Sequence, residues 1–314
     1  MPPLPLLRLP QLILCEVFKS LSIGEKINLS LCSKKVSIQI NNARLYSQKV
    51  YVHLDMYTHK IEVHSENGED SFEIFTYPDS RISQNSDTQQ FYIAGCSVPV
   101  ISIPTGIKIF WKNRQEGCLS VIRHLLKIFQ CKFSIDNVCN SESYSCFKTT
   151  SELFNLQVEF KKLTIYLRGS EDEHLWWNQI SNKFGLVETL EILTSDLGFN
   201  PVFTSWPQHI DITNSAWFTL EHFLACTCTS IILFQSHLES MDLDAILKTW
   251  KAGKLPNLNF LWLHSLTMTD NGATILGMNS RELNGMVIQT DDGSKKARIN
   301  AGVCCIEMSV TPSE

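Results

Sequence analysis

The N-terminal forty residues place apolar side chains at helical spacing. Pro10 is tolerated in a first helical turn. Ser22 and Glu25 fit a capping box, in which the serine oxygen accepts from a free backbone N–H and the glutamate reaches back to the cap. The pattern predicts short helices over residues 9–40, with apolar positions at Leu12, Ile13, Val17, Phe18, Leu21, Ile27 and Leu29.

The hydrophobic period changes to two near residue 49. Val50, Val52 and Leu54 alternate with polar residues, and two further runs repeat this alternation, as half-buried strands do. Asn67-Gly68, between the second and third runs, suits a tight turn. The sequence therefore predicts an antiparallel β-meander over residues 49–77, followed by short strands near 91–94, 98–103 and 107–111.

A strongly amphipathic helix is expected after these strands, because several aliphatic side chains fall on one helical face. Two polar stretches, residues 79–90 and 136–150, are predicted to be loops. The residues on the apolar helical face are Leu119, Ile122, Leu125, Leu126 and Phe129.

An apolar motif with gaps of two residues and then one recurs five times in the C-terminal half. Successive copies start 27, 20, 21 and 30 residues apart, close to the period of roughly 20–29 residues of leucine-rich repeats. Helices are expected between several copies, one opening at the capping box Ser170–Glu173 and others over 217–225 and 242–251. Such strand-plus-helix units cannot bury their own apolar faces, so they are expected to stack. The copies are Phe160-x-x-Leu163-x-Ile165, Val187-x-x-Leu190-x-Ile192, Pro207-x-x-Ile210-x-Ile212, Cys228-x-x-Ile231-x-Leu233 and Leu258-x-x-Leu261-x-Leu263.

The residue that follows each repeat motif departs from the usual pattern. Where leucine-rich repeats usually carry Asn or Cys, the second to fourth copies have Ser195, Ser215 and Ser236. A serine satisfies some backbone groups of the following loop, but less completely, so an irregular array is expected. An ordinary α/β domain with evenly spaced strands is the alternative.

The composition excludes several classes of function but identifies none. The 314 residues are 44% hydrophobic and 19% charged, which is ordinary for a globular protein. The net charge of -5 gives no basic surface for binding nucleic acid or an anionic membrane. No apolar run approaches the roughly 20 residues needed to span a bilayer. The eleven cysteines mostly lie among aliphatic residues, as reduced core cysteines do. We therefore expect a cytosolic or nuclear protein that binds neither nucleic acid nor membrane.

Catalytic and metal-binding patterns are absent from the sequence. No zinc spacing, His-Glu-x-x-His motif, phosphate loop or nucleophile elbow occurs, so no metal, cofactor or enzymatic activity is expected. Asp291-Asp292, before Gly293, fits a hairpin turn. Trp177 is the tryptophan most expected to face outward. An enzyme would require a pocket that joins distant residues such as a Cys and a His.

Two sets of strings resemble a known family. The stretches Leu6–Leu21 and Lys26–Lys35, with a Leu-Pro start and an aliphatic ladder, resemble an F-box. Several strings further along resemble the type 2 F-box-associated domain of the nematode family of F-box proteins. They are Ile122–Lys127, Phe203–Pro207, Leu224–Cys228, Leu247–Lys251 and Met286–Gly293.

The resemblance implies an architecture and a set of partners. It implies an α/β (α+β) chain with a three-helix F-box over residues 1–45, a β-rich connecting region over 46–110 and an F-box-associated domain over 111–314. The spacing of the apolar motif predicts that this last domain contains leucine-rich-repeat-like units. The F-box would bind a Skp-type adaptor of a cullin complex, and the C-terminal domain would bind a target protein for ubiquitination. By position, the adaptor-facing residues would be Leu9, Pro10, Leu12, Ile13, Val17 and Leu21, with Phe18 packing internally.

Two alternatives stay open at this stage. The N-terminal apolar stripe could simply pack on residues 49–77. A protein that binds the adaptor could also act as a scaffold outside a ligase.

Overall fold

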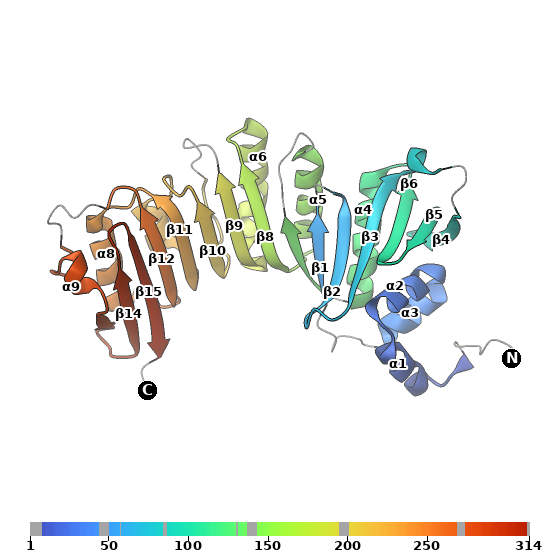
Figure 1. The fold of residues 1–314 in the computed structure, drawn as a ribbon, viewed down its shortest axis with the longest axis horizontal. Helices are drawn as coiled ribbons and strands as arrows, with labels where there is room; N and C mark the ends of the chain where they lie inside the picture. Colours follow the sequence, from blue (N-terminus) through green and yellow to red (C-terminus); the bar gives the residue numbers. More distant parts are fainter. Residues whose placement is uncertain are drawn as a thin grey trace. The chain divides into compact units, whose positions relative to one another are not determined.

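The computed structural model describes residues 8–43, 50–56, 58–83, 87–129, 131–136, 143–194, 201–268 and 274–312. The chain divides into two compact units, residues 1–153 and 154–314. Each unit combines helices with a sheet (Figure 1), in agreement with the predicted α+β class. The finer division at residues 45 and 110 stays a prediction.

Three short helices open the N-terminal unit, and the second is fixed firmly to the sheet. The predicted capping box of Ser22 and Glu25 is present. The Ile23 backbone N–H, next to this cap, donates to Asp70 Oδ2 at 2.6 Å. Gly24 approaches so closely that a Cβ there would lie 2.6 Å from the Phe72 ring. The helices are α1 (Gln11–Ser20), α2 (Ile23–Cys32) and α3 (Lys34–Asn42).

The sheet of this unit has the strand order β7-β1-β2-β3-β6-β5-β4. The β1-β2-β3 meander is antiparallel, as predicted, and Gly68 at its second turn has φ +72°. Alternate residues are buried along most of these strands, which explains the period of two in the sequence. The strands are β1 (Val50–Asp55), β2 (Lys60–Ser65), β3 (Ser71–Pro78), β4 (Gln89–Ile93), β5 (Cys96–Ile103), β6 (Gly106–Trp111) and β7 (Lys132–Asp136).

Two longer helices complete the unit, and one of them was not expected. The amphipathic helix is α4 (Arg114–Phe129), which contacts β3, β4 and β6. The prediction of a loop over 136–150 is wrong, because α5 covers Ser143–Asn155. Its polar residues suit a helix because Thr150 Oγ1 donates to the carbonyl of Cys146 at 2.9 Å, four residues earlier. The loop predicted over 79–90 contains a short 3₁₀-helix, η3 (Asp79–Arg81), and the start of β4.

Five parallel strands form the centre of the C-terminal unit, and the five sequence motifs lie on them in register. Leu163 pairs with Leu190, Leu190 with Ile210, Ile210 with Ile231, and Ile231 with Leu261. Each of these side chains is at most 2% exposed. The motif therefore marks one continuous buried row across β8 (Phe160–Leu167), β9 (Val187–Thr194), β10 (His209–Thr213), β11 (Ser230–Ser236) and β12 (Phe260–Ser265).

Helices cover one face of these parallel strands (Figure 1). The predicted capping box of Ser170 and Glu173 begins the first helix, and Gly253 follows the last with φ +73°. One orientation prediction on the first helix is wrong, because Trp177 was expected to face outward and is only 1% exposed. The Trp177 Nε1–H donates to the carbonyl of Val202 at 3.0 Å, which allows the ring to be buried. The elements are α6 (Glu171–Ile180), η4 (Ser181–Leu186), α7 (Leu220–Ala225) and α8 (Ser240–Lys251).

The serines that follow the apolar motifs bind loop backbone, as the sequence suggested. Ser215 Oγ donates to the carbonyl of Phe234 at 2.8 Å, and Ser236 Oγ accepts from the Leu238 N–H at 3.1 Å. Ser265 adds a third such residue, since its Oγ lies 2.7 Å from the Leu238 carbonyl oxygen. All three are fully buried, whereas Ser195 lies outside the described residues.

An antiparallel segment ends the chain. The strand order of the unit is β13-β14-β15-β12-β11-β10-β9-β8, so the last strand inserts beside β12. The C-terminal stretch is therefore a paired strand through Pro312. Gly293, at φ +74°, lies in the predicted hairpin turn. No helix in the described part of the chain has the length and apolar character of a membrane span. The remaining elements are α9 (Ser280–Leu283), β13 (Val287–Gln289), β14 (Lys295–Ala301) and β15 (Cys305–Pro312).

Candidate functional site

Helix α1 presents an uncovered apolar stripe. Leu12 is 82% exposed and Ile13 is 49% exposed, although both are aliphatic. Leu14 and Phe18, on the opposite side, are buried, as was expected for Phe18. The six residues predicted to face an adaptor are all exposed or half-buried: Leu9, Pro10, Leu12, Ile13, Val17 and Leu21.

The exposure of this stripe excludes the alternative that it packs on residues 49–77. If the stripe packed on residues 49–77, Leu12 and Ile13 would be buried, and they are not. The helix packs on α3 instead, through its other side. Two adjacent large aliphatic side chains in contact with water make the stripe a candidate docking surface.

The second candidate surface is the face of the C-terminal parallel sheet that carries no described helix. Its central row is formed by the residues between the buried motif positions, because strand side chains alternate between faces. Asp211 of β10 pairs with Glu191 on one side and Ile232 on the other, and Ile232 pairs with Trp262. Glu307 of β15 follows Trp262. The row therefore has an apolar centre with a carboxylate on each flank.

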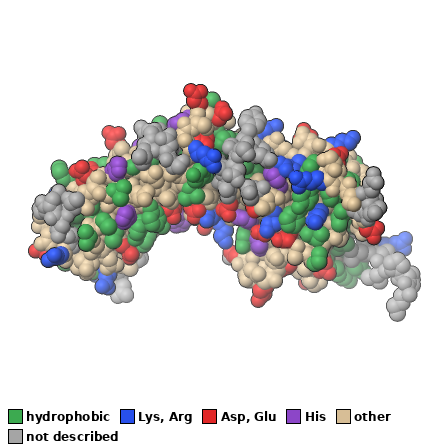
Figure 2. All heavy atoms as spheres, turned by 45° about the horizontal axis from the view of Figure 1, so that its top comes forward, with side chains coloured by type: hydrophobic (Ala, Val, Ile, Leu, Met, Phe, Trp, Pro, Cys, Tyr) green, Lys and Arg blue, Asp and Glu red, His purple; other side chains and the backbone are tan. Residues whose placement is uncertain are grey.

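Aromatic side chains enlarge the apolar centre. The Phe234 and Trp262 rings lie 4.4 Å apart, and His264 stacks beside Trp262 at 6.3 Å. Gln235 has φ +51°, and the β11–β12 register shifts at this point, so a bulge sets the direction of Phe234. Phe234 remains 40% exposed. Figure 2 shows hydrophobic side chains reaching the surface of this unit.

Asp211 carries a carboxylate without a bound counter-charge. It has no hydrogen bond or ion pair among the described residues, whereas the neighbouring Glu191 is paired with Lys162 at 2.8 Å. Partial burial raises the pKa of Asp211, repulsion from Glu191 raises it further, and attraction to Lys162 offsets part of this rise. A half-buried, unpaired carboxylate beside an apolar patch favours a cationic group from a partner. No motif in the sequence marks Asp211 or Trp262, although the alternation of side chains within the apolar motif places both on the face opposite the buried row.

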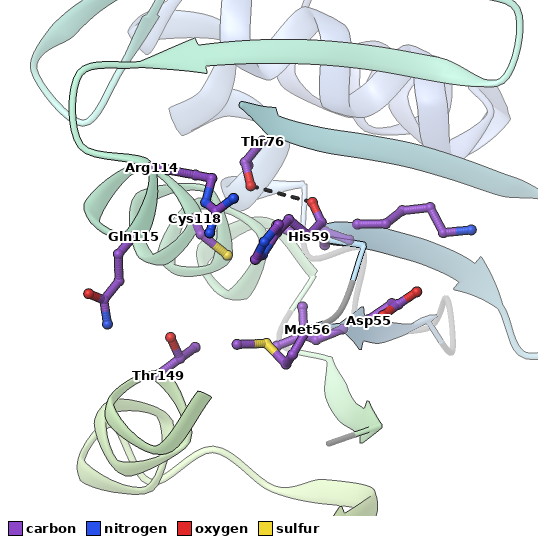
Figure 3. Close-up of a pocket in the computed structure, with 11 residues that line it drawn as sticks. Asp55, Met56, His59, Thr76, Arg114, Gln115, Cys118 and Thr149 are labelled. Carbon is purple, nitrogen blue, oxygen red and sulfur yellow. Dashed lines mark hydrogen bonds between the residues drawn. The ribbon is translucent and has the colours of Figure 1, made fainter. Parts of the chain in front are cut away.

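A small cavity in the N-terminal unit joins a cysteine and a histidine, the pairing that an enzyme would have required. Figure 3 shows His59 and Cys118 at this cavity, with Arg114 and Thr149 on its walls. Its volume is about 20 Å³, enough for one water molecule and no substrate. Burial raises the pKa of the Cys118 thiol to about 12, so the nucleophilic thiolate does not form near neutral pH. The cavity therefore gives no support to cysteine catalysis.

The other histidines and cysteines have structural surroundings. His222 Nδ1 accepts from the Thr219 N–H at 3.2 Å and so caps α7, and burial lowers its pKa. Burial raises the pKa of Cys131 to about 12. Cys32 is exposed, although its sequence neighbours predicted burial. Within the described residues, no three His, Cys, Asp or Glu side chains gather as metal ligands would.

Comparison with protein families gives two matches. A model for the F-box domain matches residues 6–48, and a model described as F-box associated matches residues 199–263. The chain carries an F-box and a type 2 F-box-associated domain. The F-box match includes α1, α2 and α3, and the F-box-associated match includes β10, α7, β11, α8 and most of β12.

One curated relative is E3 ubiquitin-protein ligase hecw-1 of Caenorhabditis elegans, 22% identical over 272 residues. These cover 78% of this chain but only 21% of that protein, so the chain spans about a fifth of the length of the curated relative it matches. No solved structure matches. Proteins with an F-box and this associated domain are substrate adaptors rather than enzymes. Both candidate surfaces lie within these matches: the α1 stripe in the F-box, and Asp211 and Trp262 in the F-box-associated domain.

Proposed function

We propose that this protein is the substrate receptor of a Skp–cullin–F-box ubiquitin ligase. Its F-box binds the Skp-type adaptor, and its C-terminal unit binds a target protein. The observation that carries the proposal is the uncovered stripe of α1, which lies inside the F-box match and leaves Leu12 82% exposed. The receptor contributes proximity and orientation, and the cullin-bound partners supply the covalent chemistry.

The adaptor interface is proposed to centre on the α1 stripe. An amphipathic helix that leaves aliphatic side chains in water gains free energy when a partner groove covers them, at about 1.5–3 kcal/mol for each large aliphatic residue. Leu12 and Ile13 are the main anchors, and Pro10 fixes the approach of the chain to the helix. The remaining contacts are proposed to come from Leu9, Val17 and Leu21.

The target interface is proposed to lie on the open sheet face of the C-terminal unit. The apolar centre around Trp262 and Phe234 supplies aromatic area, the kind of surface that dominates binding energy in interfaces. Asp211 supplies an unpaired carboxylate beside it. The target segment is therefore expected to combine an apolar side chain with a lysine or arginine.

The C-terminal unit is further proposed to be an irregular leucine-rich-repeat-like array. The support is the in-register stacking of the five motif copies and the loop-binding serines. Because Asn is the usual residue at the serine position, Ser215→Asn is expected to melt at least as high as Ser215→Ala. A lower melting temperature for the asparagine variant would contradict the repeat assignment.

A cytoplasmic or nuclear location is also proposed, supported by the free thiols of the ten described cysteines. Imaging of a fluorescently tagged chain tests it, and a secreted product would refute it.

The decisive experiment is affinity purification with mass spectrometry while the proteasome is inhibited. The wild-type chain is expected to recover a Skp-type adaptor, a cullin and a target. The double variant Pro10→Ala/Leu12→Asp is expected to lose the adaptor and cullin but keep the target. Leu175→Asp is the matched control, because Leu175 is an equally aliphatic, 62% exposed residue of α6. Adaptor recovery by the double variant at the wild-type level would refute the F-box assignment.

A second pair of variants separates a ligase from a scaffold. Asp211→Asn/Trp262→Ala is expected to keep the adaptor and lose the target. Silencing of the gene is expected to raise the level of the recovered target if the protein directs degradation. An unchanged target level would instead indicate a non-degradative scaffold.

A further inference from the structure

A second hollow in the N-terminal unit gathers positive charge. Its volume is about 320 Å³, and its walls come from α2, α3, α4 and the turn between β4 and β5. The side chains that matter here are Lys34, Ser37, Ser120, Arg123, His124 and Lys127.

The charge of the hollow is unbalanced. Three cationic side chains line it and no carboxylate does, although the whole chain has 32 acidic and 27 basic residues. Within the described residues, Lys34 and Lys127 have neither an ion pair nor a side-chain hydrogen bond. Arg123 has a single contact, Nη2 to Glu152 Oε2 at 3.5 Å, which leaves most of its N–H donors unused. Three like charges around one concavity repel one another unless an anion enters.

Neutral donors lie on the same walls. Ser37 is only 6% exposed, and its hydroxyl has no hydrogen-bond partner among the described residues. Because Ser37 lines the hollow, its hydroxyl can donate to a ligand there. Ser120 adds a second hydroxyl from α4.

His124 fixes the walls relative to each other. The Ser30 hydroxyl donates to the Ile27 carbonyl at 2.7 Å, so its oxygen accepts from His124 Nε2 at 2.8 Å. Burial, with a smaller effect from Lys127, lowers the pKa of His124 to about 4, so the ring is neutral at neutral pH. The neutral ring therefore joins α2 to α4 and keeps the hollow formed without adding charge.

We propose that this hollow binds a phosphate monoester. Such a group carries about -1.5 to -2 charges at neutral pH and three acceptor oxygens, which match three cations and two hydroxyls. A carboxylate would leave two cations unpaired. The hollow is within the size range of small-molecule sites, roughly 300–1,000 Å³, so it has room for an organic group beyond the phosphate. Tyr92, 55% exposed at the wall, supplies an aromatic contact for that group.

The phosphate could belong to a free metabolite or to a phosphorylated side chain. Because the hollow joins the F-box helices to α4, the ligand would also bind the F-box more firmly to the sheet. This inference is independent of the proposed ligase function, since it needs neither adaptor nor target.

Calorimetry and thermal melting of the full chain test the proposal with defined probes. The probes are glucose 6-phosphate, a phosphoserine peptide, and the unphosphorylated sugar and peptide as controls. At least one phosphorylated probe is expected to bind saturably and raise the melting temperature, and its identity distinguishes the metabolite from the protein source. Absence of saturable binding by both phosphorylated probes would overturn the proposal.

Charge variants locate the binding. Lys127→Gln is expected to weaken binding about tenfold, the loss expected for one charge-assisted contact, and Lys127→Arg to restore it. Lys35→Gln is the matched control, because Lys35 is exposed on α3 next to Lys34 but lies outside the hollow. Equal affinity in Lys127→Gln and Lys35→Gln would refute the site. Folding does not confound the comparison, since removal of a repelling charge is expected to leave the ligand-free melting temperature unchanged or higher.

Discussion

Replacement of Leu12 by alanine should weaken adaptor binding without weakening the fold. Leu→Ala removes the equivalent of three methylene groups, each worth about 0.8 kcal/mol when buried. Leu12 is 82% exposed in the free chain, so nearly all of that area is available for burial by a partner. The expected loss is about 2 kcal/mol of binding free energy, or about 30-fold in Kd. The stability of the free chain should change by less than about 0.5 kcal/mol, because an exposed side chain makes few contacts.

Titration calorimetry of the purified chain with a Skp-type adaptor measures the change in Kd. Leu14→Ala is the informative contrast, because Leu14 is only 3% exposed on the same helix. It is expected to cost about 2–5 kcal/mol of folding free energy, measured by urea denaturation. A Kd for Leu12→Ala within threefold of wild type would refute the assignment of α1 as the docking helix, and so would a large loss of fold stability.

Three further predictions concern the fold and the open face. Asp211→Asn should raise the melting temperature at neutral pH: the folded-state pKa of Asp211 is raised, so the ionised carboxylate destabilises the fold. The difference in melting temperature between variant and wild type should vanish as the pH falls from above this raised pKa to below the ordinary value near 3.8. A variant that melts lower than wild type at neutral pH would contradict this prediction. Ser265→Ala should cost about 1–3 kcal/mol in urea denaturation, because it removes a buried hydroxyl that donates to the Leu238 carbonyl and accepts from the Thr267 N–H. An unchanged midpoint would disprove that role. Gly117→Ala should destabilise the fold by about 1–3 kcal/mol, since the new Cβ would lie 2.2 Å from the Trp111 ring. Gly185→Ala is the control, because open space surrounds Gly185. Equal urea-denaturation midpoints for the two variants would disprove the close packing at Gly117.

Local signals in the sequence predicted much of the fold, because each has a direct physical cause. The capping boxes at Ser22 and Ser170 formed because a side-chain oxygen and a glutamate satisfy backbone donors within one turn. The apolar motif predicted the five parallel strands, since only in-register pairing places all its members in one buried row. Gly293 has a positive φ, as its position in the predicted hairpin turn required.

The wrong or missing predictions concern elements whose structure depends on tertiary contacts. Helix α5 was missed because serines and threonines favour loops in isolation, whereas in the fold Thr149 and Thr150 are buried, as are the apolar side chains Phe147, Leu153 and Phe154. Trp177 was expected outside because sequence does not show the Val202 carbonyl that accepts from its indole. The last strand was unpredictable because its partner, β12, lies some forty residues earlier.

The candidate surfaces differ in how far sequence alone could define them. The adaptor stripe could be named residue by residue, because the F-box strings fix the register, although its role stays a prediction. The open face could not, because the residues between motif positions carry no pattern of their own. Only the strand register brings Asp211, Ile232 and Trp262 together.

Hydrogen–deuterium exchange of the full chain, with and without a purified Skp-type adaptor, tests the central claim most directly. We expect the adaptor to slow amide exchange in peptides covering α1, Gln11–Ser20, and to leave exchange in β10, β11 and β12 unchanged. Unaltered exchange in α1 on saturation with the adaptor, or protection on those three strands instead, would contradict it.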